Sequence, residues 1–460
     1  MTLLAVTLLV PWAAGALLVV LDGRRRVVAW LGVAALAATL VLLAVLTVRV
    51  VVSGPQQLVT GGWPPGIGIV LRADALGDAF ALVSVLVLLT AAAHEAVAGP
   101  RARTFPGLLV LLAAGLTGLF LTADLFNFYV FFEISMTASY ALTAYGGATR
   151  QLRAAMVFAA VNLLGSIIFL MSVAGTYHIT GALGMDDVAA RMPAVGANAG
   201  LLVAVGFFVA FSVKLGLFPF HFWLPTVYAG SRPAVAAVLS GAVANIGGYG
   251  LLRFGGGLFP QQLQLAAGAL VVLGAASIVY GAVLATSRGD TAETLAYSAI
   301  GQVGYVLVAL GVGGPVGFTA AVLYTLVNAL NKGLLFLATE LRGRLVAAAF
   351  VIGALSVAGV PPAVGFLGKL ELFRTAVTDG GVVLVVLLVL GSALSLLYMF
   401  QTYQRTFWRD RQPGGGPATA LPGRLIVAAL GVVVLALGLW PEPLLALSER
   451  AADVLTGGHA

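Results

Sequence analysis

The sequence predicts an all-α, polytopic membrane protein with about fourteen transmembrane helices. Of its 460 residues, 61% are hydrophobic and only 9% are charged, whereas about a quarter of the residues in a soluble domain carry a charge. The mean hydropathy is +1.06. Apolar stretches of about 20 residues, the length needed to cross roughly 30 Å of hydrocarbon, recur along the whole chain. These observations exclude a soluble domain or a disordered chain, and the absence of cysteine excludes disulfides.

We predict fourteen spans. In chain order they cover residues 2–21, 27–52, 73–93, 106–122, 124–145, 154–176, 199–219, 234–254, 264–286, 295–312, 317–340, 345–378, 381–408 and 422–446. The first span is not expected to be a cleaved signal peptide, because no basic segment precedes it and Arg24, Arg25 and Arg26 follow it.

The arginines predict the orientation of these spans. Of the 24 basic residues, 21 are arginine, and nearly all of them lie between the apolar stretches. Loops and flanking ends after odd-numbered spans carry fifteen arginines, against six after even-numbered spans and in the C-terminal tail. Because Lys and Arg gather on the cytoplasmic side of a membrane, we expect both termini on the outer face.

Four ionisable residues lie within predicted spans: Glu133, Lys214, Lys332 and Lys369. Each costs about 2.5–3.5 kcal/mol at the bilayer centre, so we expect all four to face the protein interior. A buried lysine can release its proton whereas an arginine cannot, and a carboxylate at a variable distance from a lysine acts as a proton switch. The four residues therefore predict a proton pathway, with a static buried ion pair as the alternative for Glu133.

Proline interrupts two of the spans. Span seven runs into Pro219 and Pro225, and span twelve contains the adjacent Pro361 and Pro362. Proline frees a backbone carbonyl, which protein or water must satisfy at membrane depth. Broken helices at matching places in two halves indicate a transport site, although a simple kink is the alternative for each.

Further polar residues are candidate members of this pathway. His221 lies in the break of span seven, where an ordinary pKa near 6.5 would let it relay a proton; a packing histidine is the alternative. Asp124, at the start of span five, is equally compatible with a helix N-cap. Asn328 and Glu340 lie four residues before and eight after Lys332, so we expect the three on one face of span eleven.

The remaining polar residues predict no further chemistry. His94, Glu95 and His178 lie near span ends, where we expect them at the membrane interface, and Glu371 is expected to pair with Arg374 at the membrane edge. The four histidines lack metal-ligand spacing, and the sequence has no Walker A motif. We therefore predict no metal, cofactor or bound nucleic acid, and attribute the net charge of +7 to cytoplasmic loops.

Five segments resemble the antiporter-like membrane subunits of respiratory complex I, membrane-bound hydrogenases and Mrp-type sodium/proton antiporters. The segments are DLFNFYVFFE at 124–133, KLGLFPFHFWLP at 214–225, LAYSAIGQVGY at 295–305, NKGLLF at 331–336 and GVPPAVGFLGK at 359–369. The resemblance covers about residues 70–410, and the sequence of the first segment is most similar to that of the Mrp branch.

The resemblance implies fourteen helices with two inverted five-helix repeats, broken at helices seven and twelve. It divides the chain into an N-terminal three-helix segment at 1–105, a first repeat at 106–254, a second repeat at 264–408, and a C-terminal helix and tail at 422–460. By position, Glu133 and Lys214 would be the coupled pair of the first half, and His221 a relay. Lys332 would lie on the central axis, and Lys369 at the exit of the second half.

The function that the resemblance implies is proton translocation in a multisubunit Na⁺/H⁺ antiporter of the bacterial plasma membrane. The partners would be other membrane subunits, lipid, protons and sodium ions, and the chain would be a secondary transporter subunit without chemistry of its own. A proton-pumping subunit of a redox complex is one alternative. A structural subunit with an interrupted relay is another.

Three positions depart from the family pattern. Asn245 stands where relatives usually carry a lysine, and Asn328 where a histidine is common. Residues 290–293 read DTAE where relatives often have Asp-x-Lys-Arg. Asparagine cannot titrate but can hold water, so Asn245 either bridges the path through water or interrupts it.

Overall fold

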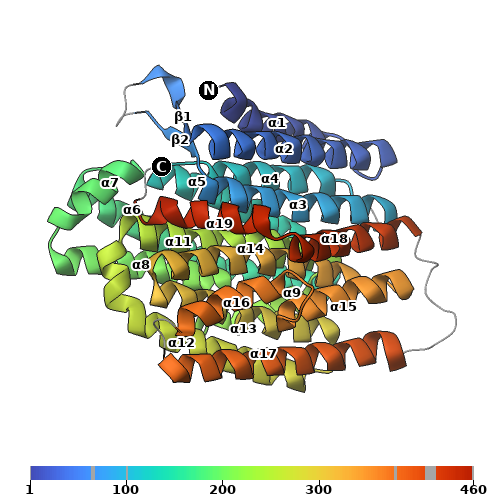
Figure 1. Cartoon of the computed structure of the whole chain (residues 1–460). Helices are drawn as coiled ribbons and strands as arrows, with labels where there is room; N and C mark the ends of the chain where they lie inside the picture. Colours follow the sequence, from blue (N-terminus) through green and yellow to red (C-terminus); the bar gives the residue numbers. More distant parts are fainter. Residues whose placement is uncertain (1, 64–67, 100–101, 378–380, 410–420, 458–460) are drawn as a thin grey trace.

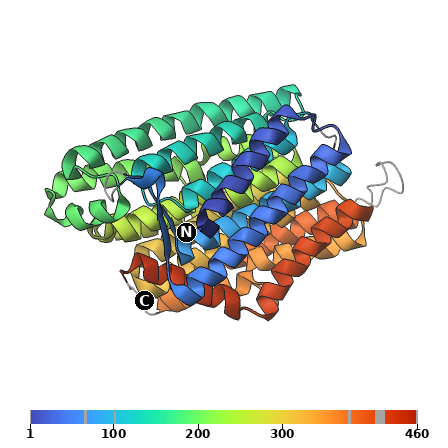
Figure 2. The same ribbon diagram turned by 90° about the horizontal axis from the view of Figure 1, so that it is seen from above.

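A computed structural model describes residues 2–63, 68–99, 102–377, 381–409 and 421–457. Long helices lie side by side along one direction and form a single bundle (Figure 1). The start of α1 and the end of α19 lie at the same end of this bundle (Figures 1 and 2). This helical architecture confirms the predicted fold class.

The N-terminal segment contains three helices and a small hairpin. In order, its elements are α1 (Thr2–Val20), α2 (Arg26–Ser53), β1 (Gln56–Val59), β2 (Val70–Ala73) and α3 (Ala75–Ala98). The two strands pair antiparallel, with Gln56 opposite Ala73. The hairpin was not expected, and it ends directly before Asp74, whose carboxylate caps α3 by accepting from the Gly77 N–H.

The two central parts of the chain each contain one broken helix. The first comprises α4 (Phe105–Phe120), α5 (Leu125–Thr143), α6 (Thr149–Thr180), α7 (Met185–Arg191), α8 (Ala197–Leu215), α9 (Leu224–Gly230), α10 (Pro233–Val238) and α11 (Asn245–Leu252), with π-helical segments at Leu239–Val243 and Arg253–Leu258. The second comprises α12 (Pro260–Ser287), α13 (Thr291–Val312), α14 (Gly314–Ala338), α15 (Arg344–Ala358), α16 (Gly365–Thr375) and α17 (Gly381–Tyr403).

The C-terminal part differs from the predicted single span over 422–446. The apolar helix α18 covers Leu421–Leu439, and Pro441 then precedes a separate helix, α19 (Glu442–Leu455). Proline suits the first residues of a helix but not its interior, which explains why a new helix begins here.

Each predicted span falls on one helix or on a pair of consecutive helices. Eleven helical segments within the described ranges are long and apolar enough to cross a membrane, and α4 and α15 are shorter apolar helices. The number fourteen and the pairing into inverted repeats stay predictions.

The centre of the bundle consists of α13, α14 and the helix that joins α10 to α11, in which nearly every residue is buried. In helices α1, α2, α6, α12 and α17 only about a third of the residues are buried, and the rest are exposed or half-buried on the outside of the bundle. Charged residues on α14 are therefore surrounded by protein and not by lipid.

Candidate functional site

The helix of span seven is broken at Gly216, between α8 and α9. Gly216 has a φ of 63°, in the left-handed region that glycine adopts most readily. The Leu217 N–H donates to the Ser212 carbonyl at 3.1 Å, and the peptide bond before Pro219 is cis. The break therefore places Lys214 in the last turn of α8.

The break of span twelve repeats this local structure. Gly359 has a φ of 79°, and the Val360 N–H donates to the Leu355 carbonyl at 2.9 Å. The bond between Pro361 and Pro362 is cis, and Pro362 follows Gly359 by three residues, as Pro219 follows Gly216 in span seven. The two breaks thus share a left-handed glycine, the same hydrogen bond across the turn and the same proline spacing.

Side chains satisfy carbonyls near each break. The Trp223 indole Nε1–H donates to the Val213 carbonyl at 2.9 Å. The Lys369 Nζ donates to the Ala358 carbonyl at 3.1 Å. Because a carbonyl left free at membrane depth must find a donor, the second break binds a buried amine directly.

In the first half, the structure brings Glu133 and Lys214 into one buried region. Lys214 is buried, and its Nζ lies 4.3 Å from the centre of the Phe132 ring, a distance typical of a cation–π contact. Glu133, which is half-buried, follows Phe132 directly on α5. Among the described residues, no hydrogen bond or ion pair joins the two, and neither the Lys214 Nζ nor the Glu133 Oε1 has a protein partner.

Other polar groups of the first half share this property. Buried side-chain oxygens on α4, α5, α6 and α8 have no hydrogen-bond partner within the described part of the chain: those of Thr117, Tyr140, Asn162, Ser166 and Ser212. Buried polar groups are normally hydrogen-bonded to protein or to ordered water. The first half therefore offers water-binding groups near Glu133 and Lys214.

His221 lies in the first break and faces α12. It is half-buried, and its ring centre lies 4.3 Å from that of Tyr280 and 5.4 Å from that of Phe218. Its Nδ1 has no protein partner among the described residues. Pro225 is the second residue of α9, a position that proline tolerates well.

In the second half, Lys332 is fully buried on α14 and is held by α13. Its Nζ donates to the Ser298 Oγ at 2.7 Å and to the Leu295 carbonyl at 3.3 Å. The Ser298 Oγ lies 2.9 Å from the Tyr398 hydroxyl on α17. Three helices thus meet at this amine.

The polar contacts continue from Tyr398 towards Lys369. The Gln302 Nε2 donates to the Tyr398 hydroxyl at 3.2 Å, and the Tyr324 hydroxyl donates to the Gln302 Oε1. The Tyr324 ring lies 5.3 Å from that of Tyr305, and the Lys369 Nζ lies 4.9 Å from the centre of the Tyr305 ring. All these side chains are buried, so a line of polar groups extends from Lys332 almost to Lys369. We call it the Lys332–Lys369 chain.

Sequence reasoning found the two ends of this chain but not its middle. Ser298 and Gln302 are four residues apart on α13, the spacing of one helix face, and this was the available signal. Tyr398 comes from another helix about a hundred positions later, so its hydrogen bonds to the Ser298 and Gln302 side chains were not predictable.

The two asparagines that depart from the family pattern have different surroundings. The Asn245 Nδ2 donates to the Ser84 Oγ on α3 at 2.9 Å and to the Gly241 carbonyl at 3.1 Å. The Asn328 Oδ1 is buried without a partner among the described residues. Asn245 therefore connects the helix that joins α10 to α11 with α3.

Asp124 and Glu340 lie at helix ends. Asp124 caps α5 by accepting from the Asn127 N–H at 2.7 Å, and burial raises the pKa of its carboxyl. Glu340 lies beyond the end of α14 at Ala338, and so off the helix face that it was expected to share with Lys332. Its carboxylate forms an ion pair with Arg232 at 3.3 Å.

A buried ion pair between Asp74 and Arg253 was missed. Arg253, one of the six arginines counted in loops and flanking ends after even-numbered spans, is buried, and its Nη2 contacts both Asp74 carboxylate oxygens at 2.6 and 2.7 Å. Its Nε–H donates to the Tyr249 hydroxyl at 2.9 Å. Burial favours the neutral acid, but the guanidinium outweighs it and holds the pKa of Asp74 below its ordinary value. The pair joins the start of α3 to the π-helical segment that follows α11.

His94 and Glu95 are both buried in the protein near the end of α3, and their expected position at the membrane interface stays a prediction. The carboxylate of Glu371 pairs with Arg374 at 2.9 Å, as predicted.

Comparison with known proteins gives a consistent result. The family model described as "NADH:quinone oxidoreductase/Mrp antiporter, TM" matches residues 122–342 and 339–395. A Na(+)/H(+) antiporter subunit from Alkalihalophilus pseudofirmus is 30% identical over 98% of this chain and 96% of its own length.

Two solved structures have the same fold over nearly their whole length. A chain of the Mrp complex from Dietzia has a TM-score of 0.90 at 28% identity and covers 100% of this chain and 98% of its own. A chain of respiratory complex I from Thermus thermophilus has a TM-score of 0.85 at 27% identity, over 98% and 99% respectively.

Proposed function

The chain belongs to the NADH:quinone oxidoreductase/Mrp antiporter family of membrane subunits, and from this premise we propose that it carries protons along a buried path in a multisubunit antiporter. It is an antiporter subunit of Mrp type. The path would comprise Glu133, Lys214 and His221 in the first half, and Lys332 and Lys369 in the second.

The Lys332–Lys369 chain is the observation that supports this proposal most directly. A hydroxyl both donates and accepts, so Ser298 and Tyr398 can each take a proton from one side and release one on the other. The Gln302 amide binds two tyrosines through its opposite ends. Buried amines at both ends of a polar chain are energetically unfavourable at membrane depth. Proton transfer is a function that accounts for their presence there.

In the first half, Glu133 and Lys214 exchange a proton through water. The unpartnered polar groups on α4, α5, α6 and α8 would bind that water. His221 then accepts a proton beside Tyr280, on the side of the break that faces α12.

Asn245 is the first residue of α11 in the first half, and it cannot carry a proton itself. Water beside its amide would bridge the position, because an amide both donates and accepts. A structural subunit without proton flux is the second candidate function, and the bonding of Asn245 to Ser84 is the observation that favours it.

The wider arrangement follows from the same proposal. Residues 106–254 and 264–408 would be the two inverted repeats, flanked by 1–105 and 422–460. Both termini would lie on the outer face of a bacterial plasma membrane, with the arginine-rich loops inside. Inward proton flow would drive Na⁺ outward in a complex with other membrane subunits, surrounded by lipid.

Everted membrane vesicles that contain the chain with its partner subunits test the proposal. We expect Na⁺-dependent collapse of an imposed pH gradient, lost in Lys214→Ala and Lys332→Ala. Tyr398→Phe removes one hydroxyl from the chain and lowers the rate about tenfold, the effect of losing one hydrogen bond of roughly 1.4 kcal/mol. Tyr177→Phe, on the outward face of α6 where Tyr177 is 56% exposed, is the matched control and keeps the wild-type rate.

Other outcomes would select the alternatives. Pumping driven by NADH or hydrogen, with no effect of sodium, assigns the chain to a redox complex. Wild-type flux in both Glu133→Ala and Lys214→Ala leaves only the structural subunit.

A further inference from the structure

Five charged or titratable side chains gather at the end of the bundle opposite the β-hairpin. They are His94 and Glu95 near the end of α3, Tyr145 after α5, Arg232 before α10 and Glu340 after α14. None of them contacts the Lys332–Lys369 chain among the described residues, and the proposed path does not use them. We call them the α3-end cluster.

Direct contacts join four of the five. The Tyr145 hydroxyl donates to the Glu95 Oε1. The Arg232 guanidinium lies 5.7 Å from the centre of the Tyr145 ring, and its Nη2 lies 3.3 Å from the Glu340 Oε1. The fifth residue, His94, directly precedes Glu95 on α3 and is buried.

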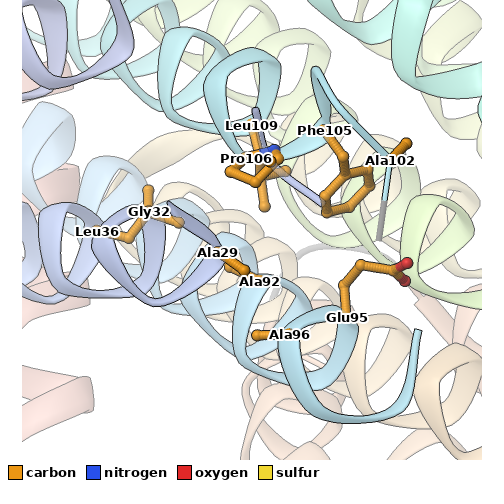
Figure 3. Close-up of a pocket in the computed structure, with 11 residues that line it drawn as sticks. Ala29, Gly32, Leu36, Ala92, Glu95, Ala96, Ala102, Phe105, Pro106 and Leu109 are labelled. Atoms are coloured by element: carbon orange, nitrogen blue, oxygen red, sulfur yellow. The ribbon is translucent and has the colours of Figure 1, made fainter. Parts of the chain in front are cut away.

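The cluster extends from the surface into the protein. The Arg232 and Glu340 side chains are 27% and 32% exposed, whereas Glu95 and His94 are buried and both His94 ring nitrogens lack a partner among the described residues. Figure 3 shows Glu95 beside an apolar pocket between α2, α3 and α4, with its carboxylate directed past Phe105 and away from the apolar lining. The Tyr145 hydroxyl is one of the polar contacts of this carboxylate.

We infer that the α3-end cluster is a port through which protons pass between the aqueous phase and the buried path, an inference that rests on the proposed function. A proton from water binds the Glu340 carboxylate and releases Arg232 from its ion pair. The Tyr145 O–H then passes its proton to the Glu95 carboxylate while the phenol oxygen takes another from the aqueous side.

The environment of Tyr145 fits this exchange. Burial, reinforced by the Glu95 carboxylate, raises the pKa of the Tyr145 phenol, so Tyr145 stays neutral and transfers a proton only as it gains one. Within the described ranges, the charged groups in contact with Tyr145 include Glu95 on α3 and Arg232 before α10. Helices α3, α10 and α14 pack against one another, and Glu340 follows the end of α14, the helix that carries Lys332.

A static clamp between helix ends is the alternative role. A glutamine at position 95 still accepts the Tyr145 hydrogen bond but cannot titrate, so Glu95→Gln separates the two roles. Glu95→Asp keeps a titratable carboxylate. Asp186→Asn is the matched control, because it breaks the Arg72–Asp186 pair of 2.7 Å at the opposite end of the bundle.

Everted vesicles with the assembled complex expose this end of the bundle to the medium, if the arginine-rich loops are cytoplasmic. We expect Glu95→Gln and Tyr145→Phe to lower the rate of pH-gradient collapse about tenfold or more, and Glu340→Gln to shift the medium pH of half-maximal rate. Glu95→Asp retains most of the flux and Asp186→Asn retains all of it. Immunoblots of the membranes normalise each rate to the amount of assembled complex.

The remaining outcomes overturn the port or the path separately. Wild-type rates and pH profiles in Glu95→Gln and Tyr145→Phe, with flux lost in Lys332→Ala, remove the port and leave the proposed path standing. Equal losses per assembled complex in Glu95→Gln and Glu95→Asp also overturn the port, in favour of a packing role. Full flux in Lys332→Ala refutes the path itself.

Discussion

Removing the Asp74 carboxylate leaves the Arg253 guanidinium buried without its counter-ion. The two groups are in bidentate contact at 2.6 and 2.7 Å, and both residues are buried. Breaking a buried pair by removing one partner costs about 3–5 kcal/mol. Asp74→Asn retains the cap on α3, which costs about 1 kcal/mol to lose. We therefore expect Asp74→Asn to lose about 3 kcal/mol of stability, and Asp74→Ala about 1 kcal/mol more.

The contribution of the Asp74 carboxylate to stability changes with pH in a defined direction. Because the folded pKa of Asp74 lies below its ordinary value of 3.8, its contribution is fully present above that value and is lost as the pH falls through the folded pKa. The difference between wild type and Asp74→Asn is thus complete at neutral pH and shrinks in acid. Denaturant titration of the full chain in detergent, followed by the fluorescence of its six tryptophans, measures this difference.

The matched control is the exposed pair between Arg72 and Asp186, in which the Asp186 side chain is 69% exposed. Asp186→Asn should cost less than about 1 kcal/mol, as exposed pairs do. If Asp74→Asn is no less stable than Asp186→Asn at neutral pH, or if its deficit is the same in acid, Asp74 and Arg253 do not form the pair described above.

Three further predictions concern single side chains. Trp223→Phe leaves the Val213 carbonyl without its 2.9 Å donor, so thermal unfolding should show a loss of about 1–3 kcal/mol. Asp124→Asn keeps a capping acceptor but removes a carboxyl whose pKa is raised by burial. The variant should be at least as stable as wild type at neutral pH and no more stable than wild type in acid. A lower stability than wild type at pH 7 would contradict this. Gln302→Glu places a titratable group in the Lys332–Lys369 chain, and we expect the pH gradient in vesicles to decay without added sodium; unchanged decay would count against conduction through this position.

The helix breaks show what sequence can predict about such a protein. Pro219 and Pro362 mark them because proline cannot continue a helix, and a glycine three residues earlier supplies the left-handed turn. Both are local constraints. The spans were predictable for the same reason, since length and hydropathy are properties of one segment.

The contacts between helices were not predictable in this way. Arg253 follows an apolar stretch and was counted as a loop residue, but its partner Asp74 lies 179 positions earlier. Tyr398 was one of twelve tyrosines, and only the packing of α17 against α12 and α13 gives it a role. The burial of Glu95 and its contact with Tyr145 were missed because the packing around α3 cannot be inferred from α3 alone.

The Gln302 amide affects whether protons can leak across the membrane through this chain of polar groups. A continuous line of hydroxyls between two amines would transfer protons at all times. It would then dissipate the proton gradient that an antiporter uses. An amide nitrogen holds its protons far more firmly than a hydroxyl does, so a proton cannot readily hop through Gln302 while it bridges Tyr398 and Tyr324. On the proposed path, Gln302 would therefore block proton transfer while it makes these two hydrogen bonds, and a proton would pass only when the amide turns aside.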